Sequence, residues 1–215
     1  KNQGRMEKAR AHYEAALDIH CELGNRRSEG IVLSQLGNLH PQHGRVEEAR
    51  AHYEAALAVA RELGDRHQEG MALGNLGILH LNQSRMDEAR AHFEAALAIA
   101  REIGHRRTEG TSLINLGCLH YNHGRMDEAR TDFEAALAIA REIGDRRTES
   151  LALNNLGSLH DNQGRMEEAR AHFEAALAIA RELGNRHLEG GCCRELGALL
   201  LERLAYGWWR LARRH

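Results

Sequence analysis

The sequence predicts an all-α fold, a right-handed superhelical solenoid built from antiparallel helix hairpins. Good helix formers (Ala, Leu, Glu and Arg) dominate the 215 residues, which include a single proline, the residue least compatible with a helix interior. Sequence motifs return every 40 residues. Within each unit, apolar residues recur at gaps of three and four, which is typical of a helix with one buried face.

The 40-residue period continues without insertion from residue 4 to about residue 200. Glu-Ala-Ala-Leu begins at positions 14, 54, 94, 134 and 174, and Leu-Gly-x-Leu begins at positions 36, 76, 116, 156 and 196. Such periods indicate a solenoid, in which each unit buries its apolar face only against its neighbours. We therefore expect a single solenoid over residues 1–215. Its predicted parts are a second helix alone (1–24), four full repeats (25–64, 65–104, 105–144 and 145–184), and a partial repeat with a divergent C-terminal helix (185–215).

The first helix of the unit 65–104 is predicted over residues 66–82, directly after Asp65, which belongs to a residue type favoured at the N-cap. Its expected buried stripe consists of Leu73, Leu76, Leu79 and His80. Gly77 interrupts this stripe, although a glycine in a helix costs about 1 kcal/mol relative to alanine. Glycine recurs in the same position of every repeat. This recurrence predicts that the partner helix approaches closely there.

A second helix is expected to follow after a short turn and to end at Gly104, since glycine commonly adopts the left-handed conformation at a helix C-terminus. Its predicted buried stripe consists of Met86, Ala89, Phe93, Ala96, Leu97, Ala100 and Ile103. Arg90 and Glu94 lie one turn apart on the opposite face of this helix, which we predict to be exposed to solvent. We predict the same exposure for the other acidic residues of the repeats.

The unit resembles the tetratricopeptide repeat, whose signature is W-x2-L-G-x2-Y, then A-x3-F, then P, over about 34 residues. The matching residues are Leu73 in the Trp position, Leu76, Gly77, His80 in the Tyr position, Ala89 and Phe93. The closing proline is absent and the unit is longer, similar to the repeats of spindle-orientation adaptors, kinesin light chains and many bacterial signalling proteins. The resemblance implies that the first helices line a concave groove, and that the groove binds a protein or an extended peptide segment.

Comparison among the repeats separates the groove residues from the packing residues, because constant positions are expected to pack and variable positions are free to recognise a ligand. The variable positions of the first helices include Ile78, Leu81, Ile114, Tyr121 and Asn154. We predict that Ile78, Leu81, Ile114 and Tyr121 select the side chains of the ligand. Asn154 occupies one of these variable positions and is expected on the same face.

Two polar positions of the first helices barely vary. The first row is Asn75, Asn115 and Asn155, and the second is Asn82, Asn122 and Asn162. An Asn amide both donates and accepts, as a peptide backbone requires. The resemblance implies that such a ladder holds the backbone of a bound segment. In the alternative interpretation, the amides bond neighbouring helices and stabilise the stack.

Other functional classes have little support. The 29 basic and 31 acidic residues leave no basic surplus for nucleic acid, and no apolar run is long enough for a membrane span. No phosphate-binding loop, nucleophile elbow or zinc-protease motif is present, so we expect neither an enzyme nor a cofactor. The 15 histidines and four cysteines lack paired metal-ligand spacing, so no metal is expected. Unpaired cysteines predict reduced thiols and a cytoplasmic location.

The sequence departs from the repeat after Leu199, and the tail contains Trp208, Trp209 and Arg210, a candidate interface. Three interpretations remain open: a helix that caps the solenoid end, a docking or self-association element, and a basic helix on a membrane surface. The leading functional hypothesis is a protein- or peptide-binding scaffold or adaptor. The alternative is an oligomerisation module that assembles homo-oligomers through the solenoid ends or the Trp-containing tail.

Overall fold

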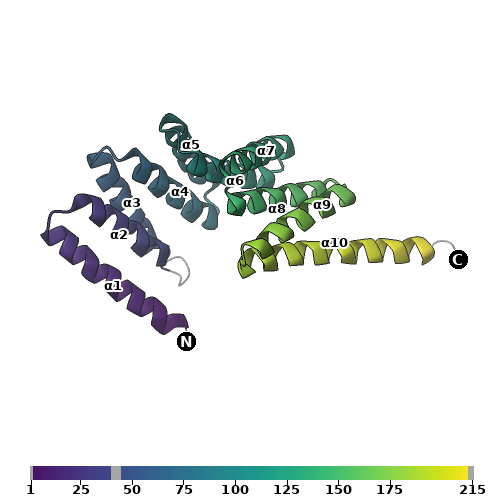
Figure 1. The fold of residues 1–215 in the computed structure, drawn as a ribbon, viewed down its shortest axis with the longest axis horizontal. Helices are drawn as coiled ribbons and strands as arrows, with labels where there is room; N and C mark the ends of the chain where they lie inside the picture. Colours follow the sequence, from purple (N-terminus) through teal and green to yellow (C-terminus); the bar gives the residue numbers. More distant parts are fainter. Residues whose placement is uncertain (1, 40–44, 213–215) are drawn as a thin grey trace. The chain divides into compact units, whose positions relative to one another are not determined.

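The computed structural model describes the backbone of residues 2–39 and 45–212, and the side chains of residues 4–39 and 45–201. Over these residues every regular element is an α-helix (Figure 1). The helices are α1 (Asn2–Glu22), α2 (Arg26–Leu39), α3 (Val46–Glu62), α4 (Arg66–Asn82), α5 (Met86–Glu102), α6 (Arg106–Asn122), α7 (Met126–Ile143), α8 (Arg146–Asn162), α9 (Met166–Glu182) and α10 (Arg186–Ala212). The predicted class, an all-α repeat of helix hairpins, is confirmed.

The chain divides into two compact units, residues 1–112 and 113–215, with the boundary inside α6. In the first unit, consecutive helices from α1 to α5 pack against one another, and in the second unit consecutive helices from α7 to α10 do the same. The predicted repeats 25–64, 65–104 and 145–184 each contain one such antiparallel pair, α2 with α3, α4 with α5 and α8 with α9. The first helix predicted over residues 66–82 has the same bounds as α4.

Among the described residues, four glycines of first helices each lie against an aromatic ring of the following second helix. A Cβ atom placed on Gly77 would lie 2.4 Å from Cε1 of Phe93, much closer than real Cβ contacts allow. The equivalent distances to the facing ring are 2.5 Å at Gly37, 2.5 Å at Gly117 and 2.6 Å at Gly157. Phe93 is fully buried. The recurring glycine therefore makes room for a ring, which is the close approach that the sequence predicts.

The buried stripe of α5 differs from the prediction at its C-terminal end. Ala89, Phe93 and Ala96 are buried as expected, but Ile103 is exposed and Ile99 is buried in its place. The reason is that α5 ends at Glu102, so Ile103 occupies the C-cap and leaves the helical periodicity. Gly104 then has a φ of +67°, the left-handed conformation predicted for it.

The N-caps of the first helices follow the predicted pattern and add one unexpected member. Asp65 accepts a hydrogen bond from the Gln68 N–H at 3.1 Å, and Asp145 accepts from the Thr148 N–H at 3.3 Å. At the same position of the intervening repeat, Nδ1 of His105 accepts from the backbone N–H of Thr108 at 3.3 Å. A neutral imidazole thus replaces the carboxylate as the cap of α6.

A buried glutamate joins consecutive hairpins, which corrects the prediction that the acidic residues of the repeats are solvated. The carboxylate of Glu69 on α4 accepts from Nε of Arg61 on α3 at 3.0 Å and from Nη1 of Arg66 at 2.5 Å. Arg66 also pairs with Glu102 at the end of α5. Burial alone would raise the pKa of Glu69, and the hydrogen bonds from Arg61 and Arg66 outweigh it, so this pKa lies below its usual value.

The same arrangement recurs along the chain. Glu109 is held by Arg101 and Arg106, and Glu149 by Arg141 and Arg146. In each case the first arginine comes from the end of one second helix and the glutamate from the following first helix. Because both carboxylates are also buried, losing either arginine would leave a charge without compensation. The row therefore fixes the connection between one hairpin and the next.

The contact between ring and glycine predicts opposite effects for two substitutions in α4. Gly77→Ala should lower the free energy of unfolding by about 1–3 kcal/mol, because the new methyl group overlaps the Phe93 ring. Gly74→Ala should be neutral or stabilising by up to about 1 kcal/mol, since a Cβ there meets nothing within 4 Å. Urea unfolding followed by circular dichroism measures both. Equal effects of the two substitutions would contradict the proposed role of Gly77.

Candidate functional site

In the first unit, one stripe of α4 presents apolar and amide side chains alternately. Met71 is 43% exposed and Ile78 is 42% exposed. Asn75 lies half-buried between them, and Asn82 continues the stripe as an exposed residue. Gaps of four, three and four residues place these side chains on one face of the helix. Leu81 is half-buried beside this stripe.

Met71 is a member of this surface that reasoning from the sequence missed. Its equivalents are Ile31, which is exposed, Thr111, Leu151 and Gly191. The signal was present in the sequence, because this position varies among repeats and lies four residues before the constant asparagine. The surface on α4, named here the α4 face, therefore consists of Met71, Asn75, Ile78 and Asn82.

In the second unit, some of the predicted groove residues bond one another. Nδ2 of Asn155 on α8 donates to Sγ of Cys118 on α6 at 3.5 Å, and the hydroxyl of Tyr121 donates to the carbonyl of Ser158 at 3.4 Å. Burial raises the pKa of Tyr121, and a hydrogen bond with Asn162 offsets part of this rise. Asn155 and Asn162 thus connect α6 with α8, as expected if these asparagines stabilise the stack of helices.

Other predicted residues have unused hydrogen-bonding capacity. Asn75 and Asn115 are half-buried and make no side-chain hydrogen bond to any residue that the structure describes. Oδ1 of Asn154 is buried without a partner in the same set of residues. A buried polar atom left without a partner costs about 1–3 kcal/mol. Asn122 is exposed, whereas Ile114 is only 7% exposed and presents little surface to a ligand.

Histidine pairs lie between the two helices of individual hairpins. The rings of His80 on α4 and His92 on α5 are stacked with their centroids 5.1 Å apart, and His160 and His172 lie 4.9 Å apart. Desolvation and the charge of Arg85 lower the pKa of His80, and desolvation and His80 lower the pKa of His92. Among the described residues, no group of three or more His, Cys, Asp or Glu side chains has a geometry that could hold a metal ion.

The hairpin of α6 and α7 contains a different pair at these positions. Nδ1 of His120 lies 2.8 Å from Oδ2 of Asp132, which replaces the second histidine. Neighbouring repeats therefore place different groups, an imidazole or a carboxylate, against the histidine of the first helix.

Cys118 lies on the predicted groove side of α6 and is not activated. Burial raises the pKa of its thiol to about 11, although the hydrogen bond from Asn155 acts in the opposite direction. A thiol with this pKa is almost entirely protonated at neutral pH, and the thiolate is the nucleophilic form. Cys118 therefore acts as a small packing side chain.

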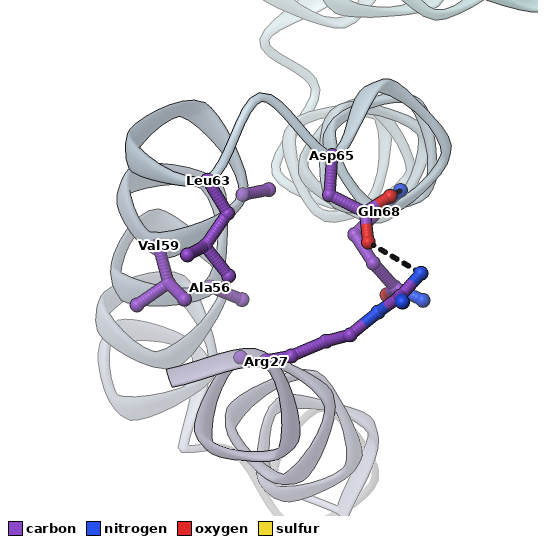
Figure 2. Close-up of a pocket in the computed structure, with 8 residues that line it drawn as sticks. Arg27, Ala56, Val59, Leu63, Asp65 and Gln68 are labelled. Atoms are coloured by element: carbon purple, nitrogen blue, oxygen red, sulfur yellow. Dashed lines mark hydrogen bonds and ion pairs between the residues drawn. The ribbon is translucent and has the colours of Figure 1, made fainter. Parts of the chain in front are cut away.

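A small recess between α2, α3 and α4 is shown in Figure 2. Arg27 reaches across it and its Nη2 lies 3.1 Å from Oδ2 of Asp65, while Val59 and Leu63 lie on the opposite side. Its internal volume of about 10 Å³ is close to the minimum that holds one water molecule. The recess is therefore too small to be the ligand site, and the exposed faces of the first helices are the better candidate.

The candidate interface at the tail falls on α10, which extends to Ala212. The side chains of Trp208, Trp209 and Arg210 lie outside those that the structure describes. Within the part of the chain that the structure describes, none of the helices has the length and apolar character needed to cross a membrane.

The chain belongs to the tetratricopeptide repeat family. The family model matches five overlapping segments that together extend from residue 1 to residue 204: residues 1–62, 28–102, 68–142, 112–182 and 148–204. No curated protein matches the chain significantly.

Solved structures of similar fold include BtubC (BKLC) from P. vanneervenii, with 23% identity, a TM-score of 0.77 and coverage of 90% of this chain and 82% of that one. Aspartyl phosphate phosphatase F from Bacillus subtilis has 14% identity and a TM-score of 0.78, with coverage of 94% and 54%. The Rap conjugation gene regulator of plasmid pLS20, solved with a Phr peptide, has 18% identity and a TM-score of 0.77, with coverage of 97% and 60%. At these identities the similarity establishes the fold. The chain spans little more than half of the latter two proteins.

The stacked pair of His80 and His92 predicts a loss of stability in acid. Because the pKa values of His80 and His92 are lowered by folding, the unfolded chain takes up protons first as the pH falls below about 6.5. The stability contributed by the neutral pair is therefore present above this pH and is lost as the pH decreases through it. Thermal unfolding between about pH 7.5 and pH 5.5 measures this loss.

His92→Asp provides the matched comparison, because it installs at this position the pair that His120 forms with Asp132. The variant should lose less stability than the wild type over the same pH interval. An equal or steeper loss in the variant would show that the stacked pair is not responsible.

Proposed function

We propose that the chain is a scaffold that binds a protein, or an extended peptide segment, on the exposed faces of its first helices. The observation that carries this proposal is the α4 face, where the unbonded amide of Asn75 lies between the exposed side chains of Met71 and Ile78. A peptide backbone supplies the donor and acceptor that this amide lacks, and its apolar side chains can cover Met71 and Ile78.

The two units contribute different features to this proposal. In the first unit the α4 face combines apolar surface with amides that bond no described residue. In the second unit, the half-buried amide of Asn115 also bonds no described residue, whereas Oδ1 of Asn154 is buried out of reach of a ligand. We therefore assign ligand contact to Asn75 and Asn115, together with Ile78, Leu81 and the exposed amides Asn82 and Asn122. Asn155, Asn162 and Tyr121 act mainly in holding α6 and α8 together.

The family supports the same class of function. Tetratricopeptide solenoids characteristically present their first helices to protein or peptide ligands, and the pLS20 Rap regulator, similar in fold, was solved with a peptide. Among the described side chains, we find no arrangement of catalytic groups that would support an enzymatic function, since Cys118 is protonated and the buried glutamates are paired with arginines. A role as a scaffold or adaptor is therefore the function that we infer.

The unbonded amides predict a binding defect that is separable from folding. Peptides selected by display against the wild-type chain should bind Asn75→Ala/Asn115→Ala at least about tenfold more weakly, which corresponds to about 1.4 kcal/mol. Thermal stability should change little, because neither amide bonds a residue in the part of the chain that the structure describes. Isothermal titration calorimetry measures the affinity, and circular dichroism the stability.

Glu94→Ala/Glu134→Ala is the matched control, because both residues are exposed and lie on the second helices. It should bind the selected peptides with the affinity of the wild type. A further variant, Asn155→Ala, should lower stability more than the double asparagine variant does. Unchanged peptide affinity in Asn75→Ala/Asn115→Ala would refute the assignment of these amides to the ligand.

A further inference from the structure

In the first unit, a residue near the start of a first helix contacts the N-cap of the following first helix at two successive places. Nη2 of Arg27 in α2 lies 3.1 Å from Oδ2 of Asp65, the N-cap of α4 (Figure 2). The equivalent residues, 40 positions further along, are His67 in α4 and His105, which caps α6. Their ring centroids lie 4.4 Å apart, with the ring planes inclined by 47°. Two half-buried imidazoles therefore take the place of an ion pair.

The imidazole of His105 caps α6 as a hydrogen-bond acceptor. Its Nδ1 accepts from the backbone N–H of Thr108 at 3.3 Å, and the hydroxyl oxygen of Thr108 lies 2.8 Å from the same nitrogen. Asp145 makes the two corresponding contacts with Thr148, at 3.3 Å and 3.1 Å. A histidine nitrogen accepts a hydrogen bond only while it carries no proton, whereas a carboxylate has no such requirement. The cap of α6 therefore requires a neutral ring with its proton on Nε2.

The surroundings of His105 favour this neutral ring. Desolvation lowers its pKa most and the charge of His67 on α4 lowers it further, whereas a backbone hydrogen bond raises it and Arg107 on α6 lowers it. At the end of α5, Arg101 and Glu102 are held in ion pairs with other residues. A protonated ring would also oppose the positive N-terminal end of the α6 dipole. Charge on the cap is therefore unfavourable for several independent reasons.

We propose that His105, packed on His67, is a pH-sensitive cap that opens the first turn of α6 in mild acid. At neutral pH the unprotonated Nδ1 holds the N–H of Thr108. On protonation Nδ1 becomes a donor, so it faces the N–H of Thr108 with an N–H of its own. The cap is then lost and the ring is repelled by His67. This inference is independent of the proposed function, because it uses the start of α6 and not the α4 face.

The direction of the pH dependence follows from the lowered pKa of His105. The unfolded chain takes up the proton first as the pH falls below about 6.5. The stabilisation provided by this cap is therefore present above that pH, and it is lost as the pH decreases through the pKa of the folded protein. An aspartate cap lacks this dependence over the same interval, since aspartate ordinarily titrates near pH 4.

Amide hydrogen exchange followed by NMR, at about pH 7.5 and about pH 5, tests the proposal. After correction for the intrinsic exchange rates, the Thr108 amide should lose about tenfold in protection relative to the Thr148 amide, a size typical of the loss of a helix cap. Thr148 is the matched reference within the same molecule, because Asp145 caps it with the same geometry. Global loss of stability would affect both amides together, so a parallel change would overturn the proposal.

The variant His67→Arg/His105→Asp installs the pair that Arg27 forms with Asp65. In this variant the protection of Thr108 should no longer depend on pH relative to that of Thr148. His92→Asp is the control, because it alters the stacked pair of α4 and α5 but not this cap. It should retain the pH dependence of the wild type at Thr108. The proposal fails if the double variant keeps that dependence or if His92→Asp abolishes it.

The nitrogen-15 chemical shifts of the His105 ring test the protonation state directly. At about pH 7.5 Nδ1 should be unprotonated and Nε2 protonated, and both nitrogens should be protonated in the acid form. Protonation should follow the same pH dependence as the loss of protection at Thr108. The opposite tautomer at neutral pH would overturn the assignment of His105 as the cap.

Discussion

The contact between an aromatic ring and a glycine backbone is the constraint on which every hairpin depends. Phe93 occupies the space in which any other residue at position 77 would place its Cβ atom. The same geometry recurs with Tyr53, where the hydroxyl also donates to Asn38 at 2.8 Å. A ring this close fixes both the separation and the register of the two helices, since sliding by one residue would bring it against a side chain. The helical cost of glycine is thus offset by burial of the ring.

Fixing the hairpin by one buried contact leaves the outer positions of the first helix free to vary. The packing between hairpins is set separately by the glutamate and its two arginines, as at Glu69, and again involves no residue of the α4 face. In the proposed function, packing and recognition therefore use different positions of α4. The repeats accordingly have nearly identical cores but different residues, such as Ile78 and Ser158, at one equivalent position of the first helix.

Much of the fold follows from the sequence because the period fixes the helices and the recurring glycine indicates close packing. The predicted α5 stripe was wrong at its two ends, since Met86 is only half-buried and Ile103 is exposed where the helix ends, and it omitted the buried Ile99. Burial of Glu69 was missed because Arg61, which pairs with it, comes from the preceding helix, and the local pair with Arg66 alone does not indicate burial. Periodicity placed the asparagines on one face of the first helices. Only the side-chain geometry shows that Asn155 donates a hydrogen bond to Cys118, whereas Asn75 has no hydrogen-bond partner among the described residues.

A double-mutant cycle between positions 77 and 93 tests the central contact most directly, with unfolding free energies measured for Gly77→Ala, Phe93→Leu and the combination. If the ring occupies the space of the missing side chain, Leu at position 93 opens room for the methyl group. The cost of Gly77→Ala should then largely disappear, with a coupling of about 0.5–3 kcal/mol. Additive effects within about 0.5 kcal/mol would mean that the ring and the glycine do not constrain each other.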